Sequence, residues 1–304
     1  MSEHKKNCAS ALTLLAGILW GLLGLFSRKL RSNGFGPLEI TFVRMAVAFL
    51  STAIPVILFR RDLLRIRFRD LWCFIGSGII SMLMFSVCYF HGLALTSLAV
   101  ATVLLYTAPT FVVLLSALIF HDPITKKKIM TLLLAFVGYI LVAGSGAGQS
   151  LSFKGFLFCL ASGFFYSLYS IFGKLAIRRG YTAVTLVFYS FFFCSICCTF
   201  FVDWDILGDA IQQHQNVLWW MFGIGFVTAF LPYTLYSIGL SQIDAGKASI
   251  LVSIELVAET VVGVTVFHEP IDLTICIGIV LVLLSIFVFN INKPLQFFAR
   301  KTSA

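Results

Sequence analysis

The chain repeats itself at a fixed offset, and this feature restricts its fold more than any other. Shifting the sequence by 147 residues without a gap superposes identical residues: Tyr89 on Tyr236, Gly92 on Gly239, Leu93 on Leu240, Ala101 on Ala248, Leu104 on Leu251 and Phe120 on Phe267. At the same register, the tetrapeptide HDPI at 121–124 falls on HEPI at 268–271. Leucine and phenylalanine matches arise easily in an apolar chain, but a polar tetrapeptide match does not. We therefore expect two copies of one structural unit.

The N-terminal segment belongs to the same repeat. Lys5 and Lys6 precede an apolar run that would pass for a signal peptide, but no convincing small-x-small cleavage site follows it. At an offset of 146 the run has a counterpart in mid-chain: Gly17/Gly163, Trp20/Tyr166, Phe26/Phe172, Arg28/Lys174 and Gly34/Gly180. We therefore interpret it as a spanning helix. Below, residues superposed by either shift are called repeat-related.

The composition predicts an all-α polytopic membrane protein. Of the 304 residues, 60% are hydrophobic and only 12% are charged, with a mean hydropathy of +0.99. A soluble fold does not bury that much apolar surface, and apolar helices of about 20 residues span a bilayer. We predict ten spans, at 9–27, 38–59, 71–94, 98–120, 128–147, 155–178, 183–202, 217–241, 246–267 and 271–291.

Five spans per unit is an odd number, so the second unit should enter the membrane from the side opposite to the first. The expected domains are a first five-helix repeat at 1–148, a second at 149–292 and a cytoplasmic tail at 293–304. Inverted repeats of this kind place a substrate site near the bilayer midplane, between the halves.

The loop charges predict the orientation. Seventeen of the 22 basic residues would share one side with the N-terminus: Lys5, Lys6, Arg60, Arg61, Arg65, Arg67, Arg69, Lys126, Lys127, Lys128, Lys174, Arg178, Arg179, Lys247, Lys293, Arg300 and Lys301. The positive-inside rule then places both termini in the cytoplasm, and the long loop around Asp203–Asp209 outside. It also explains the net charge of +9 without a nucleic-acid partner. No N-x-S/T sequon suggests a glycosylated eukaryotic protein, which favours a bacterial cell membrane.

Two carboxylates lie within the ninth predicted span. Glu255 and Glu259 are four residues apart, so a helix places them on one face. Acids inside a bilayer are costly and mark a substrate or proton pathway by default. Two neighbouring carboxylates do not both ionise readily at low dielectric, so the pair suits proton coupling. The structural alternative is that they pair with Arg44 or Lys247 and hold helices together.

Arg44 and several aromatic residues are the other site candidates. Arg44 lies inside the second span and could bind a substrate carboxylate or neutralise a glutamate. Seven aromatic residues within spans could form a cavity wall or pack the core: Trp20, Tyr89, Tyr106, Tyr166, Tyr169, Tyr233 and Tyr236. Pro109 and Pro232 should kink the fourth and eighth spans. Because their repeat-related residues are Leu256 and Phe85, the kinks should be asymmetric.

These motifs resemble the EamA-type branch of the drug/metabolite transporter superfamily over nearly the whole chain. The resemblance rests on Trp20-Gly21, on Tyr106-Thr107-Ala108-Pro109 with Asp122, and on Glu255 with Glu269, although Leu256 replaces a proline. It implies a carrier that moves amino acids, other small metabolites or drugs across the cytoplasmic membrane, often as an exporter.

The leading hypothesis is therefore a secondary transporter of a small metabolite, such as an amino acid, that works by alternating access. Export and proton coupling are open options. No G-x-x-x-x-G-K-[ST] motif suggests ATP, and no histidine accompanies the Cys194/Cys197 pair, so we expect neither cofactor nor metal. The alternative is a membrane enzyme acting on lipid head groups. Its only candidate residues, the two H-[DE]-P-I elements, should lie on opposite sides of the membrane.

Overall fold

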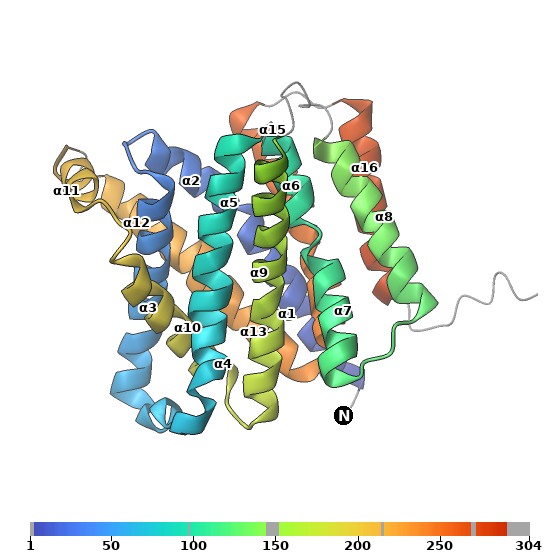
Figure 1. Ribbon diagram of the computed structural model, residues 1–304, viewed down its shortest axis with the longest axis horizontal. Coiled ribbons are helices and arrows are strands. Elements are labelled where there is room, and N and C mark those ends of the chain that lie inside the picture. The colour runs from blue at the N-terminus through green and yellow to red at the C-terminus, as the bar shows by residue number, and fades with distance from the viewer. Residues whose placement is uncertain (1–2, 97, 144–151, 214–215, 269–271, 291–304) are drawn as a thin grey trace, which may run out of the picture.

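The computed structural model describes residues 3–96, 98–143, 152–213, 216–268 and 272–290, and these residues contain helices and turns but no strand. The helices stand roughly side by side (Figure 1). The predicted tail at 293–304 lies outside the described residues, as do Glu269, Pro270 and Ile271 of the second tetrapeptide.

The helices of the first half are α1 (Glu3–Gly21), α2 (Leu23–Arg31), α3 (Pro37–Phe59), α4 (Leu71–Ile75), α5 (Met84–Leu95), α6 (Leu98–Leu105), α7 (Ala108–Phe120) and α8 (Lys126–Ala143). Short 3₁₀ turns η1 (Arg61–Leu64) and η2 (Phe68–Asp70) precede α4, and a π-helix, η3 (Gly76–Leu83), connects α4 to α5.

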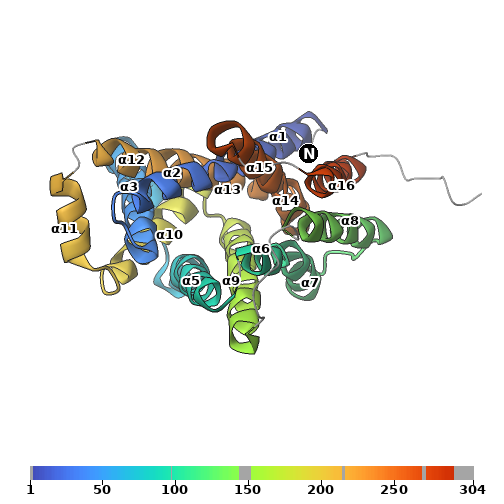
Figure 2. The same cartoon turned by 90° about the horizontal axis from the view of Figure 1, so that it is seen from above.

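The helices of the second half are α9 (Phe153–Arg178), α10 (Ala183–Cys198), α11 (Trp204–Gln213), α12 (Val217–Gly225), α13 (Leu231–Gln242), α14 (Ala245–Val252), α15 (Ile254–Phe267) and α16 (Leu273–Asn290). A second π-helix, η5 (Phe226–Phe230), lies between α12 and α13. α8 and α16 pack against each other at one edge of the molecule, and α11 lies at the opposite edge (Figure 2).

Seven segments of the described chain are long and apolar enough to cross a membrane: Asn7–Arg31, Pro37–Phe59, Phe68–Leu95, Val100–Phe120, Phe153–Arg178, Val217–Gln242 and Ala245–Phe267. Two shorter apolar helices, Ala183–Cys198 and Leu273–Phe289, accompany them. The protein is therefore an all-helical, multi-pass membrane protein. α8 carries three lysines in its first turn, which lower its mean hydropathy.

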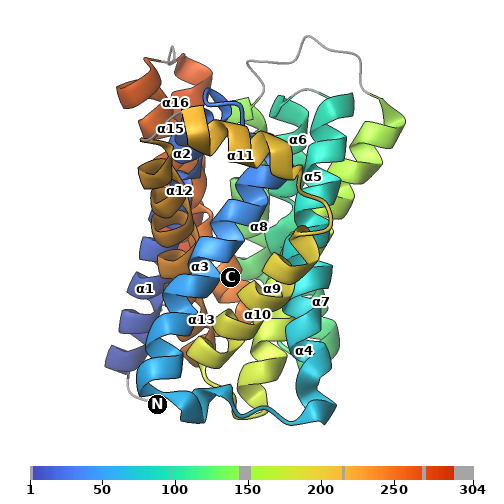
Figure 3. The ribbon, with the colours of Figure 1, turned by 90° about the vertical axis from the view of Figure 1, so that its left-hand side faces the viewer.

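The two ends of the molecule differ in charge. The N-terminus and the turns η1 and η2, which belong to the arginine-rich segment 60–69, lie at one end (Figure 3). α11 lies at the other, and the loop before it carries Asp203. These are called the basic end and the α11 end below.

Local conformations recur along the chain at the repeat offset. Gly34 and Gly180 adopt left-handed backbone angles, with φ of 89° and 92°, and His121 and His268 do so with φ of 59° and 54°. The glycines follow α2 and α9, where a left-handed residue ends a helix without steric cost. The π-helices η3 and η5 are also repeat-related.

The predicted asymmetry of the kinks is wrong. Pro109 lies in the first turn of α7, after an interruption at Tyr106-Thr107. The related helix pair is also interrupted, between α14 and α15 at Ser253, although Leu256 replaces the proline there. Pro232 begins α13 directly after η5, and Phe85 follows η3 in the same way. The surrounding packing therefore maintains each break, with proline present at only one member of each pair.

Glycines bring the two halves into close contact. A Cβ atom on Gly17 of α1 would lie 2.9 Å from the carbonyl oxygen of Val252. A Cβ atom on the repeat-related Gly163 of α9 would lie 3.1 Å from the carbonyl oxygen of Leu105. Val252 and Leu105 are themselves repeat-related. Each half therefore places its first long helix against the broken helix pair of the other half.

Candidate functional site

A cavity lies between the two halves, with about 1250 Å³ of space free of protein atoms when open solvent is included. Its lining includes all ten of the residues predicted as site candidates: Trp20, Arg44, Tyr89, Tyr106, Tyr166, Tyr169, Tyr233, Tyr236, Glu255 and Glu259. Pro109 also lines it, whereas Pro232 does not. The structure thus gathers residues from α1, α3, α5, α9, α13 and α15 around one space.

Much of the lining comes in repeat-related pairs: Trp20/Tyr166, Leu23/Tyr169, Tyr89/Tyr236, Thr102/Ser249, Leu105/Val252, Tyr106/Ser253, Ala108/Glu255 and Val112/Glu259. Ser249, Ser253 and Thr102 did not emerge from the sequence as candidates. The repeat could have identified them, because a residue that lines the cavity in one half indicates that the repeat-related residue of the other half lines it too.

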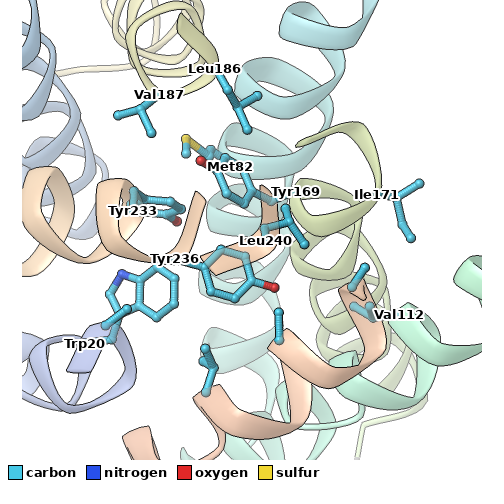
Figure 4. Close-up of a cluster of buried hydrophobic side chains, with 14 of the residues drawn as sticks. Trp20, Met82, Val112, Tyr169, Ile171, Leu186, Val187, Tyr233, Tyr236 and Leu240 are labelled. Carbon is cyan, nitrogen blue, oxygen red and sulfur yellow. The ribbon is translucent and has the colours of Figure 1, made fainter. Parts of the chain in front are cut away.

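Aromatic rings form one wall of the cavity. The ring of Tyr233 lies 4.9 Å from that of Trp20 and 4.9 Å from that of Tyr169, between ring centres. The Tyr169 and Tyr236 hydroxyls form hydrogen bonds of 2.8 and 2.7 Å with Ser237 and Ser170. These rings face one another in Figure 4. They are buried, whereas Glu259, farther along α15 and nearer the α11 end, is exposed.

Arg44 is held by the opposite half. Its Nη2 donates a hydrogen bond of 2.8 Å to the carbonyl oxygen of Thr228, which lies in η5. Its guanidinium carbon is 5.9 Å from the centre of the Tyr233 ring, a cation–π distance. The side chain is only 8% exposed, and its Nε has no hydrogen-bond partner in the described part of the chain.

Arg44 does not neutralise a glutamate by direct contact. Within the described ranges, no ion pair of 4 Å or less joins it to Glu255 or Glu259. In this conformation the structural ion pair with Arg44 is therefore not formed, and the alternative pairing with Lys247 stays a prediction. The guanidinium instead has a free donor at the wall of the cavity.

Glu255 lies in the first turn of α15, directly after the break at Ser253. The positive end of the helix dipole favours a carboxylate there. Over the residues that the structure describes, its side chain makes no hydrogen bond or ion pair and opens into the cavity. Glu259 follows one turn later and lines the same space.

Tyr139 of α8 connects the two helix breaks. Its hydroxyl donates a 2.5 Å hydrogen bond to Ser253 Oγ. Its ring stacks on Tyr106 at 4.6 Å between centres, with 23° between the planes. Because Tyr106 and Ser253 are repeat-related, one side chain bridges equivalent points of the two broken helix pairs. The sequence alone did not identify Tyr139.

The arrangement can accommodate a solute with two opposite charges. Arg44 Nε and Trp20 Nε1 are buried donors without partners among the described residues. Glu255 and Glu259 present carboxylates to the same cavity. Unpaired buried donors cost free energy, so a bound acceptor would stabilise this wall. The aromatic rings between the two groups supply apolar contact area.

The two histidines of the repeated tetrapeptides do not share this site. His121 ends α7 at the basic end, whereas His268 ends α15 at the α11 end (Figure 1). An active site built from both histidines is therefore excluded by their positions.

The fold defines a multi-pass membrane protein whose two halves enclose a central cavity. The description "EamA-like transporter family" matches the chain twice, at residues 8–144 and 153–291, and the chain belongs to this family. It is thus a transporter-family protein.

Similar proteins are also described as transporters. An uncharacterized transporter from Archaeoglobus fulgidus is 28% identical over 279 residues, which cover 91% of this chain and 94% of that protein. The uncharacterized transporter YetK from Bacillus subtilis is 24% identical, covering 74% of this chain and 69% of its own. A solved crystal structure has the same fold, with a TM-score of 0.74 and 17% identity over 93% of this chain and 96% of that one.

Proposed function

We propose that the protein is a secondary transporter that moves a small zwitterionic metabolite, an amino acid or a related compound, by alternating access. One observation carries this proposal: the Glu255 carboxylate opens, without a partner among the described residues, into the cavity that also exposes unpartnered donors of Arg44 and Trp20. A substrate carboxylate would accept hydrogen bonds from these donors, and its ammonium group would approach Glu255 and Glu259. The aromatic walls favour an apolar or aromatic side chain.

The proposal includes ten spans arranged as two inverted five-helix repeats, 1–148 and 149–292. The directions of the first helices support it, since α1 runs away from the basic end and α9 runs toward it (Figure 1). The pairing of left-handed residues, π-helices and helix breaks at the repeat offset adds further support. In such an arrangement, access alternates as one half rocks against the other around the shared site.

The helix breaks supply places for this movement. A break frees backbone carbonyls and lets the two helical parts turn separately. The breaks at Tyr106-Thr107 and Ser253 both line the cavity, and Tyr139 contacts both. We infer that opening one end requires the contacts around Tyr139 to rearrange, which couples the two breaks.

The basic end should be cytoplasmic by the positive-inside rule. Because Glu259 is exposed toward the α11 end while the aromatic rings are buried, we infer that this conformation opens to the outside. Cysteines introduced one at a time at positions 65 and 205, in a chain without native cysteines, test the orientation. An impermeant thiol reagent added outside cells should label position 205 and spare position 65. Labelling at position 65 alone would show that the protein has the opposite orientation.

The substrate proposal is tested by counterflow in proteoliposomes. Vesicles loaded with unlabelled amino acids, one at a time, should accumulate the same labelled compound only when the protein is present. Compounds lacking either the carboxylate or the amine should exchange far more weakly. Equal exchange of the amino acid and of its decarboxylated amine would contradict the role of Arg44 and Trp20 as an anion site.

A further inference from the structure

A second pocket lies at the basic end, away from the central cavity. It has an empty volume of about 690 Å³ and is lined by Arg67, Arg69, Asp70, Trp72 and Arg179. These residues come from η2 with its flanks and from the end of α9. None of them lines the central cavity, so the transport site does not account for this pocket.

The acid of this pocket is already neutralised. The Asp70 carboxylate lies 3.2 Å from Arg179 Nε and accepts a 2.8 Å hydrogen bond from the Tyr181 hydroxyl. Burial raises the pKa of Tyr181, so this hydroxyl keeps its proton and remains a donor. Arg179 is fixed further by a 2.9 Å contact with Cys73 Sγ and by stacking 4.7 Å above the Trp72 ring.

Two arginines of the pocket remain available. Arg67 and Arg69 are exposed, and neither guanidinium has a hydrogen-bond or ion-pair partner among the described residues. With Asp70 neutralised by Arg179, the pocket retains two positive charges. Paired guanidinium groups suit the oxygens of a phosphate, which they can bind bidentately.

Apolar side chains accompany the arginines. Phe68 lies between them in sequence and is 89% exposed, and Trp72 is 44% exposed. An exposed phenylalanine is costly in water but not beside acyl chains, and tryptophan favours the boundary between head groups and hydrocarbon. The pocket and the adjacent Phe68 therefore combine guanidinium groups that suit a phosphate with apolar side chains that suit lipid.

The other half of the chain provides an internal contrast. Trp72 is repeat-related to Trp219, which is 76% exposed near the α11 end. The residues related to Arg67 and Arg69 are His214 and Asn216, neither of which carries a permanent positive charge. The tryptophan therefore occurs in both halves, as expected for a general interface residue. The pair of arginines occurs at the basic end only.

We propose that this pocket binds the head group of an anionic phospholipid, with its phosphodiester at Arg67 and Arg69 and its acyl chains along Phe68 and Trp72. The lipid occupies the basic end of the protein beside η2 and does not enter the transport pathway. This proposal depends on the protein lying in a bilayer and is independent of the transported substrate.

Native mass spectrometry of the purified full-length protein tests the site. The protein in detergent is titrated with dioleoylphosphatidylglycerol or dioleoylphosphatidylcholine, and retained lipids are counted. The Arg67→Gln/Arg69→Gln variant is compared with Arg65→Gln/Lys126→Gln, which removes the same charge from exposed residues at the same end but outside the pocket. At roughly fivefold per arginine, the preference for phosphatidylglycerol should fall about 25-fold in the pocket variant. The control variant should retain most of it.

Three results would overturn the proposal. They are an unchanged lipid preference in the pocket variant, an equal loss in the control variant, and displacement of the lipid by millimolar inorganic phosphate alone. The first two would attribute the lipid preference to general surface charge, and the third would indicate a site for free phosphate. Equal melting temperatures of the three proteins in phosphatidylcholine verify that the variants fold, and a failed variant is replaced by Arg67→Lys/Arg69→Lys, which should retain part of the preference.

Discussion

The two halves of the molecule share their packing but not their chemistry. Gly17 and Gly163 contact corresponding carbonyl groups, and each half has a helix break at a related position, between α6 and α7 and between α14 and α15. The cavity-lining chemistry differs: Glu255 and Glu259 are related to Ala108 and Val112, and Arg44 is related to Ser190. The packing contacts recur because both halves need the same scaffold. Each charged residue, in contrast, occurs in only one member of its repeat-related pair.

Arg44 and Ser190 illustrate how one position serves two purposes. Both reach toward the π-helical segment of the opposite half: Arg44 bonds to Thr228 in η5, and Ser190 forms a 2.6 Å hydrogen bond with Ser77 in η3. Serine satisfies its position entirely within the protein. Arg44 makes the corresponding contact through Nη2, and its Nε remains without a partner among the described residues.

The largest expected loss of stability comes from the shared packing. Gly17→Ala and Gly163→Ala should each lower the free energy of unfolding by about 1–3 kcal/mol, because the new Cβ meets backbone atoms that cannot move aside. Gly208→Ala in α11, where a Cβ meets nothing within 4 Å, is the matched control and should be neutral or slightly stabilising. Thermal unfolding in detergent measures all three. A loss of stability at only one of the two related glycines would contradict the equivalent packing of the two halves.

Substitutions at Arg44 and at the repeat-related Ser190 should affect different properties, substrate affinity at Arg44 and stability at Ser190. Arg44→Gln should weaken the apparent substrate affinity at least tenfold, because a hydrogen bond from a charged donor is worth about 1.5–3 kcal/mol. Ser190→Ala should cost about 1 kcal/mol of stability and leave the KM for substrate unchanged. Counterflow kinetics and thermal unfolding, run on both variants, give the comparison. Similar KM values in both variants would assign Arg44 to packing.

A smaller effect is expected at Tyr139. Tyr139→Phe retains the ring stacked on Tyr106 but loses the hydrogen bond to Ser253, at a cost of about 1 kcal/mol. Because this bond bridges the two breaks, turnover should fall several-fold with little change in KM. The repeat-related Ile286→Val variant should lose similar stability without a change in turnover. If both variants transport equally well, Tyr139 does not couple the breaks.

The charged residues of the cavity could be predicted from the sequence because they violate the general rule for apolar spans. A charged residue such as Arg44 or Glu255 within a span is costly unless it faces a protected polar space. Tyrosines within spans carry the same information more weakly, since each hydroxyl needs a partner. The offset of 147 then located the helix pairs that contribute these residues.

Other features depend on contacts that sequence patterns do not encode. The break at Ser253 has no proline to indicate it in the sequence, and contacts from α1 and α8 maintain it instead. Tyr139 resembles any aromatic residue of a span until its two partners are known. The hydrogen bond from Arg44 to Thr228 joins residues 184 positions apart, and no local pattern favoured this carbonyl over a glutamate.

The central claim is that the acids of the second half bind the substrate or its coupling proton, and proton-driven flux tests it most directly. Wild-type protein, Glu255→Gln and Glu259→Gln are reconstituted in proteoliposomes, and uptake of the counterflow substrate is followed under an imposed pH gradient. We expect gradient-driven uptake to be abolished in at least one glutamine variant, with unfolding temperatures close to that of the wild type. Unchanged pH-dependent flux in both variants would contradict the claim.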